Sequence, residues 1–355
     1  MGSVHHTAAA KMGGDVQSVL RFLASLPKAE LHLHIEGTLE PELMFELAQR
    51  NHALDSLPCK TLQEMKAAYN FQDLQSFLNL YYAGCAVLRT DQDFYDLTMA
   101  YLRRAKADNV VHTEIFFDPQ THTQRGVPLK CVIEGIHRAQ EEGQRTLGIT
   151  SCLILSFLRD LGPEAAMQTL NEAEPFLGHI TGVGLDSCEL GFPPGVFQEV
   201  FQKAKTLGLK RVAHAGEEGP AQYIWEALQK LDVQRIDHGV KCLEDRKLIE
   251  SLEASEMPLT VCPLSNLELK VYSGELEKRM SELLSTDLCI TINSDDPAYF
   301  GGYLNQNYLW LIQNLGLDSQ RVVDLHANSF RASFLSQDAK TQHCEALAAA
   351  YKQAA

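Results

Sequence analysis

The chain has 355 residues, of which 45% are hydrophobic, and its 31 basic and 46 acidic residues give a formal net charge of −15. This acidic balance, with no basic cluster, argues against nucleic acid or an anionic membrane as a partner, because Lys and Arg must neutralise phosphates. The length suits one large α/β barrel, which commonly forms a single domain of roughly 250 residues or more.

Cysteine usage and the first residues indicate the compartment. Nine cysteines are scattered from Cys59 to Cys344 without a C-x-x-C pair, which argues against a disulfide framework or a zinc ribbon. The first residues lack the apolar centre of a signal peptide, and no apolar run approaches the roughly 20 residues that span a bilayer. We expect a cytoplasmic protein with a disordered leader over residues 1–20 and one domain over residues 21–355.

Short β-branched runs alternate with longer amphipathic segments, which is typical of parallel βα units. The predicted strands are Ala29–His34, Val110–Phe117, Ile149–Leu155, Ile180–Leu185, Lys210–His214, Arg235–Asp237, Leu259–Val261 and Leu288–Asn293. Eight such strands, without an internal repeat or a linker, predict a (β/α)₈ TIM barrel. Several of them end at a polar residue, and catalytic groups of such barrels occupy the carboxyl ends of the strands.

The segment between the first two strands is too long for one crossover helix. It predicts helices over Pro41–Arg50, Leu74–Leu88 and Asp91–Ala107, so we expect an extended helical insertion after strand 1. Large apolar residues recur there at helical spacing, namely Phe71, Phe77, Leu78 and Tyr81. They either pack on the barrel core, the commoner role for such residues, or roof the active site against a flat ligand.

Histidines and carboxylates recur at the predicted strand ends. His32 and His34 on the first strand project to the same face and can hold one metal ion. His214, His238 and Asp295 follow at the ends of the fifth, sixth and eighth strands. Three histidines and one aspartate suit one divalent cation, and a water would make it five-coordinate. Each residue alone could be structural, but packing explains their recurrence at one end of the barrel poorly.

The fourth strand bears on the number of metal ions. Two-metal barrel hydrolases commonly carry a lysine there that is carbamylated to bridge both ions. The segment Gly182–Glu189 contains no lysine, so one metal ion per chain is the favoured interpretation.

Four stretches occur in a specific order: L-P-K-A-E-L-H-L-H, H-A-G-E, D-H-G and S-D-D-P. With them the chain resembles the adenosine/adenine deaminase family from about Leu26 to Phe334. The resemblance implies one Zn²⁺, or alternatively Fe²⁺, held by His32, His34, His214 and Asp295. It further implies that Glu217 donates a proton to the purine ring and that His238 orients and deprotonates the attacking water. Asp296 is the implied substrate contact.

The implied reaction is hydrolytic deamination of a small purine as part of purine salvage. Metal ions make water reactive near neutral pH, histidine exchanges protons in that range, and a carboxyl group kept protonated by its site can donate to the ring. Expulsion of ammonia then completes the exchange. Two other classes of protein fit less well. An idle relative that acts as a binding protein has no chemical need for the complete residue set. A two-metal amidohydrolase would need the fourth-strand lysine, which this chain lacks.

The two candidate substrates are adenine, which gives hypoxanthine, and adenosine, which gives inosine by the same mechanism. Adenosine deaminases usually carry Asp where this chain has Glu36, and the longer carboxylate would crowd a sugar, although it could instead brace a loop. The segment Asp186–Gly191 also departs from the adenosine type, so Ser187 and Glu189 are further candidate substrate contacts. Two other stretches, Glu114–Gln120 and Cys262–Asn266, resemble the adenine-specific branch. We therefore favour adenine.

Overall fold

The computed structural model describes residues 15–69 and 74–354. Eight parallel strands pair in chain order: β1 (Lys28–His34), β2 (Val110–Phe117), β3 (Thr150–Leu158), β4 (Gly182–Asp186), β5 (Lys210–Ala215), β6 (Arg235–His238), β7 (Leu259–Val261) and β8 (Ile290–Ile292). The segment after β8 returns to β1, where the His34 amide donates to the Asp295 carbonyl (3.0 Å) and the Asp295 amide to the His32 carbonyl (3.1 Å). The predicted (β/α)₈ barrel is confirmed, and no predicted strand boundary is displaced by more than three residues.

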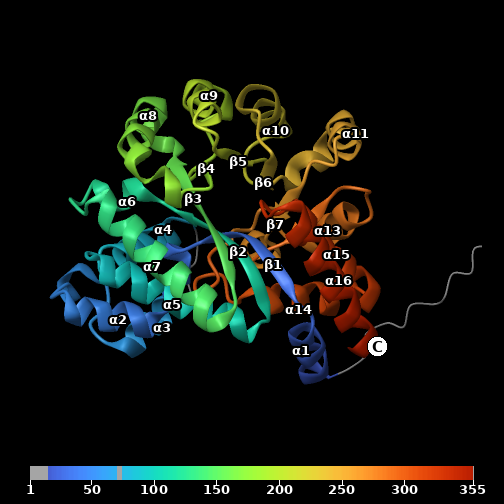
Figure 1. Cartoon of the computed structure of the whole chain (residues 1–355), viewed down its shortest axis with the longest axis horizontal. Coiled ribbons are helices and arrows are strands. Elements are labelled where there is room, and N and C mark those ends of the chain that lie inside the picture. The colour runs from blue at the N-terminus through green and yellow to red at the C-terminus, as the bar shows by residue number, and fades with distance from the viewer. Residues whose placement is uncertain (1–14, 70–73, 355) are drawn as a thin grey trace, which may run out of the picture.

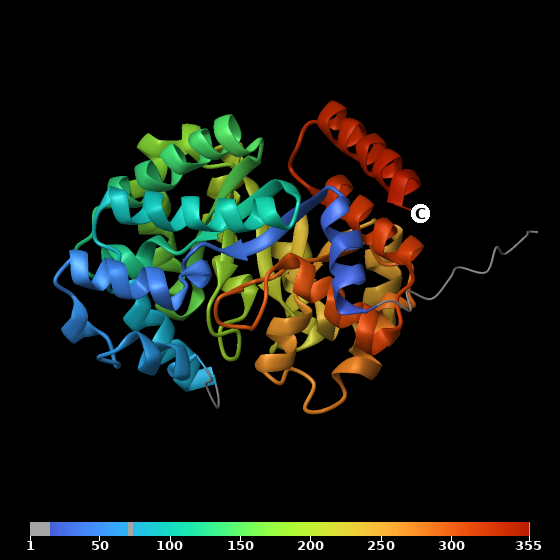
Figure 2. The same cartoon turned by 90° about the horizontal axis from the view of Figure 1, so that it is seen from below.

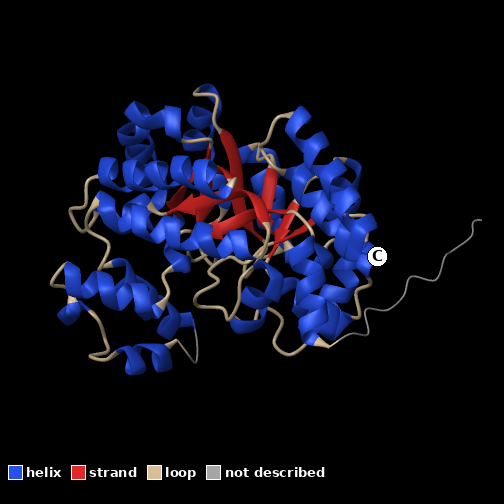
Figure 3. Cartoon of the chain, turned by 60° about the horizontal axis from the view of Figure 1, so that its bottom comes forward, coloured by secondary structure: helices blue, strands red, loops and turns tan. Residues whose placement is uncertain are grey.

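Helices surround the strands (Figures 1 and 3). They are α1 (Val16–Ser25), α2 (Pro41–Arg50), α3 (Leu62–Ala68), α4 (Leu74–Cys85), α5 (Asp91–Ala107), α6 (Pro119–Thr123), α7 (Leu129–Leu147), α8 (Gly162–Ala173), α9 (Gln198–Thr206), α10 (Ala221–Glu226), α11 (Arg246–Ala254), α12 (Pro263–Glu268), α13 (Leu276–Leu284), α14 (Leu304–Leu315), α15 (Ser319–Ala332) and α16 (Gln337–Ala354). Helices cover the outer face of each strand, and side chains of the other strands cover its inner face. Because both faces are buried, the strands are nearly continuous apolar runs. None of the helices in the described ranges is long and apolar enough to cross a membrane.

The expected insertion after the first strand consists of α2 to α5, which gather on one side of the barrel (Figure 2). The predicted helices match α2 and α5 at both ends, while α4 stops three residues before the predicted Leu88. Phe77 and Tyr81 on α4 are buried. Phe71 and the side chain of Leu78, which belong to the same prediction, lie outside the described residues.

The first helix lies beside the C-terminal helices of the barrel (Figures 1 and 2). Val19 and Leu23 bury its apolar face, so residues 16–20, which we expected in the leader, instead belong to α1; residues 1–14 lie outside the described part. Lys28 fixes the end of this helix, because its Nζ donates to the carbonyls of Leu23 (2.7 Å), Leu26 (2.8 Å) and Asp108 (2.5 Å). Burial lowers the pKa of Lys28 to about 7.

Candidate active site

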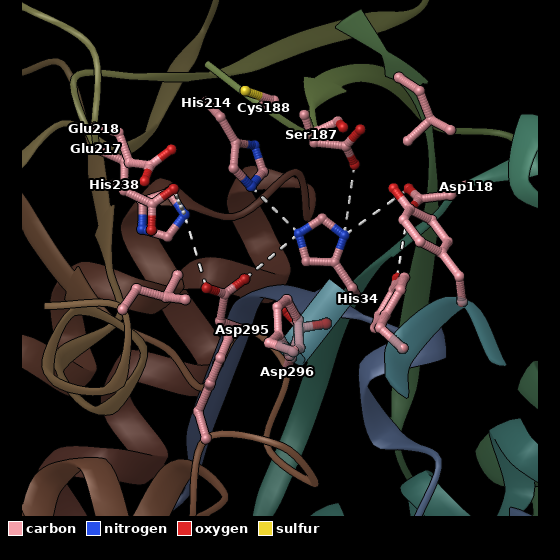
Figure 4. A pocket seen from close by; sticks show the side chains of 17 residues that line it. His34, Asp118, Ser187, Cys188, His214, Glu217, Glu218, His238, Asp295 and Asp296 are labelled. Atoms are coloured by element: carbon pink, nitrogen blue, oxygen red, sulfur yellow. Dashed lines mark hydrogen bonds and ion pairs between the residues drawn. The ribbon is translucent and has the colours of Figure 1, made fainter. Parts of the chain in front are cut away.

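The four residues predicted as metal ligands lie together at the carboxyl ends of the strands. His34 Nε2 is 3.3 Å from His214 Nε2 and 3.5 Å from Asp295 Oδ1, and His32 Nε2 is 3.2 Å from the same oxygen. All four residues are buried, and their ligand atoms lie within 4.8 Å of one another. Figure 4 shows the side chains of His34, His214 and Asp295 converging from three sides.

This arrangement fits a single metal ion. Two ligand atoms about 2.1 Å from one ion, at a tetrahedral angle, lie about 3.4 Å apart, which agrees with the separations of 3.2, 3.3 and 3.5 Å. His32 Nε2 makes no hydrogen bond to any described residue although it is buried. Burial and the neighbouring histidines lower the pKa of His214 well below its usual value, so that its imidazole is neutral and its lone pair can bind a cation.

Hydrogen bonds behind the ligands orient them. The Thr260 hydroxyl donates to Asp237 Oδ1 (2.9 Å), and Thr260 Oγ1 lies 2.8 Å from His32 Nδ1. Because the hydroxyl proton is used by Asp237, Thr260 accepts from His32 Nδ1–H, and this tautomer leaves the Nε2 lone pair for the ion. The other oxygen of Asp237 lies 3.7 Å from His214 Nδ1. Asp237 therefore orients His32 through Thr260, and it lies near His214 without a hydrogen bond to it.

A buried chain of charges continues below Asp237. The Arg235 guanidinium lies 3.7 Å from Asp237 Oδ1 and donates to Glu114 Oε2 at 2.6 Å, and Glu114 Oε1 lies 3.3 Å from His112 Nε2. Burial opposes ionisation of Glu114, but Arg235 and His112 overcome it and lower its pKa to about 2. The interior therefore carries compensated charges across the barrel, from β6 to β2.

Glu217 and His238 lie beside the metal ligands. His238 Nε2 is 3.6 Å from Glu217 Oε2 and 3.8 Å from Asp295 Oδ2. Burial, with the negative charge of Asp295, raises the pKa of Glu217 well above its usual value. Burial lowers the pKa of His238 to about 3. A carboxyl group that holds its proton thus lies next to a neutral imidazole that can accept one.

A cavity of about 520 Å³ opens over these residues. Its wall includes seven of the predicted site residues: His34, His214, Asp295, Glu217, His238, Asp296 and Ser187. Phe77 and Tyr81 of α4 also line it, so the insertion packs on the barrel and roofs the cavity at once. Asp296 Oδ1 has no hydrogen-bond partner in the described ranges, and burial, together with Asp295, raises the pKa of Asp296.

The backbone around the site is tightly constrained. A Cβ atom on Gly37 would lie 2.6 Å from the Cα of Asp296, so only glycine allows the turn after β1 to approach the loop after β8. Three residues at strand ends have left-handed backbone, with φ of 69° at Ser187, 60° at His238 and 64° at Asp295. Such conformations cost on the order of 1–3 kcal/mol each and concentrate at functional sites.

Two predicted substrate contacts, Glu36 and Glu189, lie behind the cavity wall instead of on it. Glu36 Oε1 accepts from the amide of Asp118 (3.1 Å) and lies 2.7 Å from His122 Nε2. The Glu189 carboxylate accepts from four consecutive amides, those of residues 216–219. Both Glu189 oxygens are occupied by loop backbone, and Glu36 Oε1 binds the loop after β2, so the alternative of a loop-bracing carboxylate describes both residues. Glu36 Oε2 has no hydrogen-bond partner among the described residues.

Two further residues line the cavity, Asp118 and Asp186; in the sequence they stood out only as polar residues at predicted strand ends, and we assigned them no role. Asp118 directly follows β2 and Asp186 ends β4. Asp186 Oδ2 lies 3.5 Å and Asp118 Oδ1 4.0 Å from His34 Nδ1. The available signal was their position at the ends of two predicted strands, where catalytic groups of such barrels lie.

The fold and the site define a class. Eight parallel strands that converge on three histidines and an aspartate, beside a glutamate and a fourth histidine, are the arrangement of a barrel hydrolase with a candidate metal site. The sequence model described as "Adenosine deaminase" matches residues 27–350, and the chain belongs to the adenosine deaminase family.

Relatives place it within the family. An adenine deaminase from Wolinella succinogenes is 55% identical over 318 residues, which cover 90% of this chain and 96% of that protein. One from Crocosphaera subtropica is also 55% identical, over 90% of this chain and 98% of its own length. The crystal structure of adenine deaminase from Arthrobacter aurescens superposes with a TM-score of 0.89 at 47% identity, covering 92% of this chain and 99% of that one. The predicted membership of the adenine deaminase branch is confirmed.

A more distant structure shows the same fold. An amidohydrolase from Burkholderia ambifaria, solved with bound Zn, has a TM-score of 0.88 at 24% identity and covers 98% of this chain.

Proposed function

We propose that this protein hydrolyses adenine to hypoxanthine and ammonia in purine salvage in the cytoplasm, with one zinc ion per chain. The observation that carries the proposal is the cavity in which the His34, His214 and Asp295 side chains, Glu217, His238 and Asp296 all meet. Relatives that are 53–56% identical over about nine-tenths of the chain are adenine deaminases and support the same substrate.

The donor set supports zinc. Three imidazoles and one carboxylate suit borderline divalent ions, and zinc is commonly held by histidine nitrogen and carboxylate oxygen at such distances. Bound among these residues, the ion would supply Lewis-acid activation of water. Zinc and iron are distinguished by measuring the metal content of protein purified from metal-controlled medium.

The protein's own residues would move the protons. Glu217 holds a proton in a buried carboxyl group and delivers it to a ring nitrogen, which makes the neighbouring carbon a better electrophile. His238, which is neutral and 3.6 Å from Glu217, orients the attacking water and accepts its proton. Asp296 supplies a further polar contact to the purine.

The test measures ammonia release and hypoxanthine formation by zinc-loaded protein, with adenine and adenosine supplied separately. We expect turnover of adenine and at least hundredfold lower kcat/KM for adenosine. The Glu217→Gln variant should keep its zinc and melting temperature and lose at least a thousandfold in kcat. Equal turnover of adenosine would contradict the substrate, and full activity of the variant would remove Glu217 from the mechanism.

A further inference from the structure

The cavity contains a carboxyl pair, Asp118 and Asp186, that the proposed reaction leaves unassigned. Both residues are buried, with relative exposures of 5% and 2%. Both line the same cavity as Glu217 and Asp296. Their nearest oxygens and His34 Nδ1 all lie within 4.8 Å of one another.

This pair is separated from the metal position by the imidazole of His34. Nε2 of that ring faces His214 and Asp295, while Nδ1 faces Asp186 at 3.5 Å and Asp118 at 4.0 Å. Figure 4 shows the same arrangement, with Asp295 and Asp118 on opposite sides of His34. Both ends of this arrangement line one cavity, so a flat ligand whose reacting carbon lies beside the metal position can extend its far edge toward the carboxyl pair.

Three oxygens of the pair accept no hydrogen bond of good geometry in the described part of the chain: both oxygens of Asp186, and Oδ1 of Asp118. The fourth, Asp118 Oδ2, accepts from the Tyr81 hydroxyl at 3.3 Å. The two carboxyl groups contact each other, and Asp186 lies near Ser156. Buried acceptors without partners are costly, by about 1–3 kcal/mol each. Two carboxyl groups retain acceptor oxygens in either protonation state, so the cavity offers acceptors to a donor on the ligand.

Asp118 is held in place from behind. The Glu36 carboxylate accepts its backbone amide at 3.1 Å and lies 2.7 Å from His122 Nε2, and the other nitrogen of that ring lies 2.8 Å from an Arg125 guanidinium nitrogen. This brace fixes the loop after β2 against the turn after β1. The Asp118 carboxylate can therefore discriminate between ligands by position, because the loop cannot easily retract.

We propose that Asp118 and Asp186 together recognise the N–H of the imidazole ring of the free purine and exclude purines substituted at that nitrogen. This inference rests on the proposed deamination of adenine and names its specificity determinant. An N–H···O bond puts the oxygen about 3 Å from the nitrogen. A carbon bonded to the same nitrogen would lie about 1.5 Å along that line. It would then be only about 1.5 Å from the oxygen, far inside the usual carbon–oxygen contact of about 3.3 Å. A sugar therefore loses a hydrogen bond and clashes.

The experiment compares adenine with 9-methyladenine, in which a methyl group replaces the hydrogen of this N–H. For the wild-type protein we expect kcat/KM for adenine to exceed that for 9-methyladenine by about a thousandfold or more, since sites built to bind a donor strongly reject analogues without it. In Asp118→Asn and Asp186→Asn the KM for adenine should rise about ten- to hundredfold, with kcat within a few-fold. Removing both carboxylates, in Asp118→Ala/Asp186→Ala, should raise kcat/KM for 9-methyladenine at least tenfold.

Glu250→Gln on α11 is the matched control, because Glu250 is exposed and does not line the cavity; its ratio of the two substrates should stay at the wild-type value. Metal content and thermal melting are recorded for every variant. A second ion per chain that is lost in Asp118→Asn would overturn the proposal by making the pair metal ligands. Weakened metal binding with an unchanged substrate ratio would also overturn it, since the pair would then act through His34.

The two proposals fail separately. Wild-type protein that releases no ammonia from adenine contradicts the proposed function before any variant is compared. Wild-type protein that deaminates adenine and 9-methyladenine equally keeps the deaminase and overturns the role of the carboxyl pair.

Discussion

The loop that carries Glu217 depends on one carboxylate. Glu189 accepts hydrogen bonds from the amides of Gly216 (2.5 Å), Glu217 (3.0 Å), Glu218 (2.9 Å) and Gly219 (2.8 Å). Glutamine has nearly the same shape but only one acceptor oxygen, so in Glu189→Gln at least one amide faces an NH₂ group. We therefore expect this single-atom exchange to destabilise the loop.

The magnitude follows from the lost contacts. A hydrogen bond to a charged group contributes about 1.5–3 kcal/mol, so the variant should lose about 2–3 kcal/mol. With an unfolding entropy of about 2.1 cal/mol/K per residue, a chain of 355 residues has about 0.7 kcal/mol/K, and its melting temperature should fall by about 3–4 °C. Displacement of Glu217 should lower kcat about ten- to hundredfold, because small misplacements of catalytic groups are costly.

Circular dichroism melting and ammonia release from adenine measure the two effects. Glu250→Gln is the control, since the exposed Glu250 side chain bonds to Arg246 on α11 and takes no part in these bonds. Wild-type stability and kcat in Glu189→Gln would refute the reasoning. A rise in KM alone would instead revive the original prediction that Glu189 contacts the substrate.

Three further perturbations test other parts of the structure. Thr260→Val leaves His32 Nδ1 without its partner and should weaken metal binding about ten- to hundredfold, as measured by competition with a chelator. Glu114→Gln should destabilise the protein by about 3 kcal/mol above pH 5, because Arg235 lowers the pKa of Glu114 from 4.5 to about 2. The lowered pKa stabilises the folded state only while Glu114 is ionised. In urea titrations the stability difference from wild type should therefore shrink as the pH falls from about 4.5 toward 2. Gly37→Ala would press a methyl group into the loop after β8 and should lower kcat/KM at least tenfold. Unchanged kinetics would show that this loop moves aside without disturbing the site.

The barrel could be predicted because its signals are local. Strands buried on both faces read as short apolar runs, and the eight runs in the sequence correspond to β1 to β8. The four ligands were also accessible, since His32 and His34 share a strand face and His214 and Asp295 follow strand ends, which a closed barrel brings to one rim. Strand order and residue type were enough for this part of the site.

The roles of Glu36 and Glu189 were beyond the reach of the sequence. Both stand in motifs near the ligands, but each side chain turns toward backbone amides of a distant segment, 82 residues away for the bond to Asp118 and 27–30 residues away for those at Gly216 to Gly219. No spacing rule predicts which amides lack other partners. The same limit applies to the pairing of Asp118 with Asp186, which were visible as polar residues at strand ends, because their proximity depends on the register between strands that are not neighbours in the chain.

The three carbonyls around Lys28 have a consequence for where the folding unit begins. Two of them, those of Leu23 and Leu26, come from the end of α1 and the residue after it, ahead of the first residue that matches the family. A chain cut back to that match would leave a buried ammonium group with one acceptor in place of three. The lysine would have to give up its proton or draw water into the base of the barrel. α1 therefore completes the hydrogen bonding of Lys28 at the start of β1, and any shortened version of the protein should retain this helix.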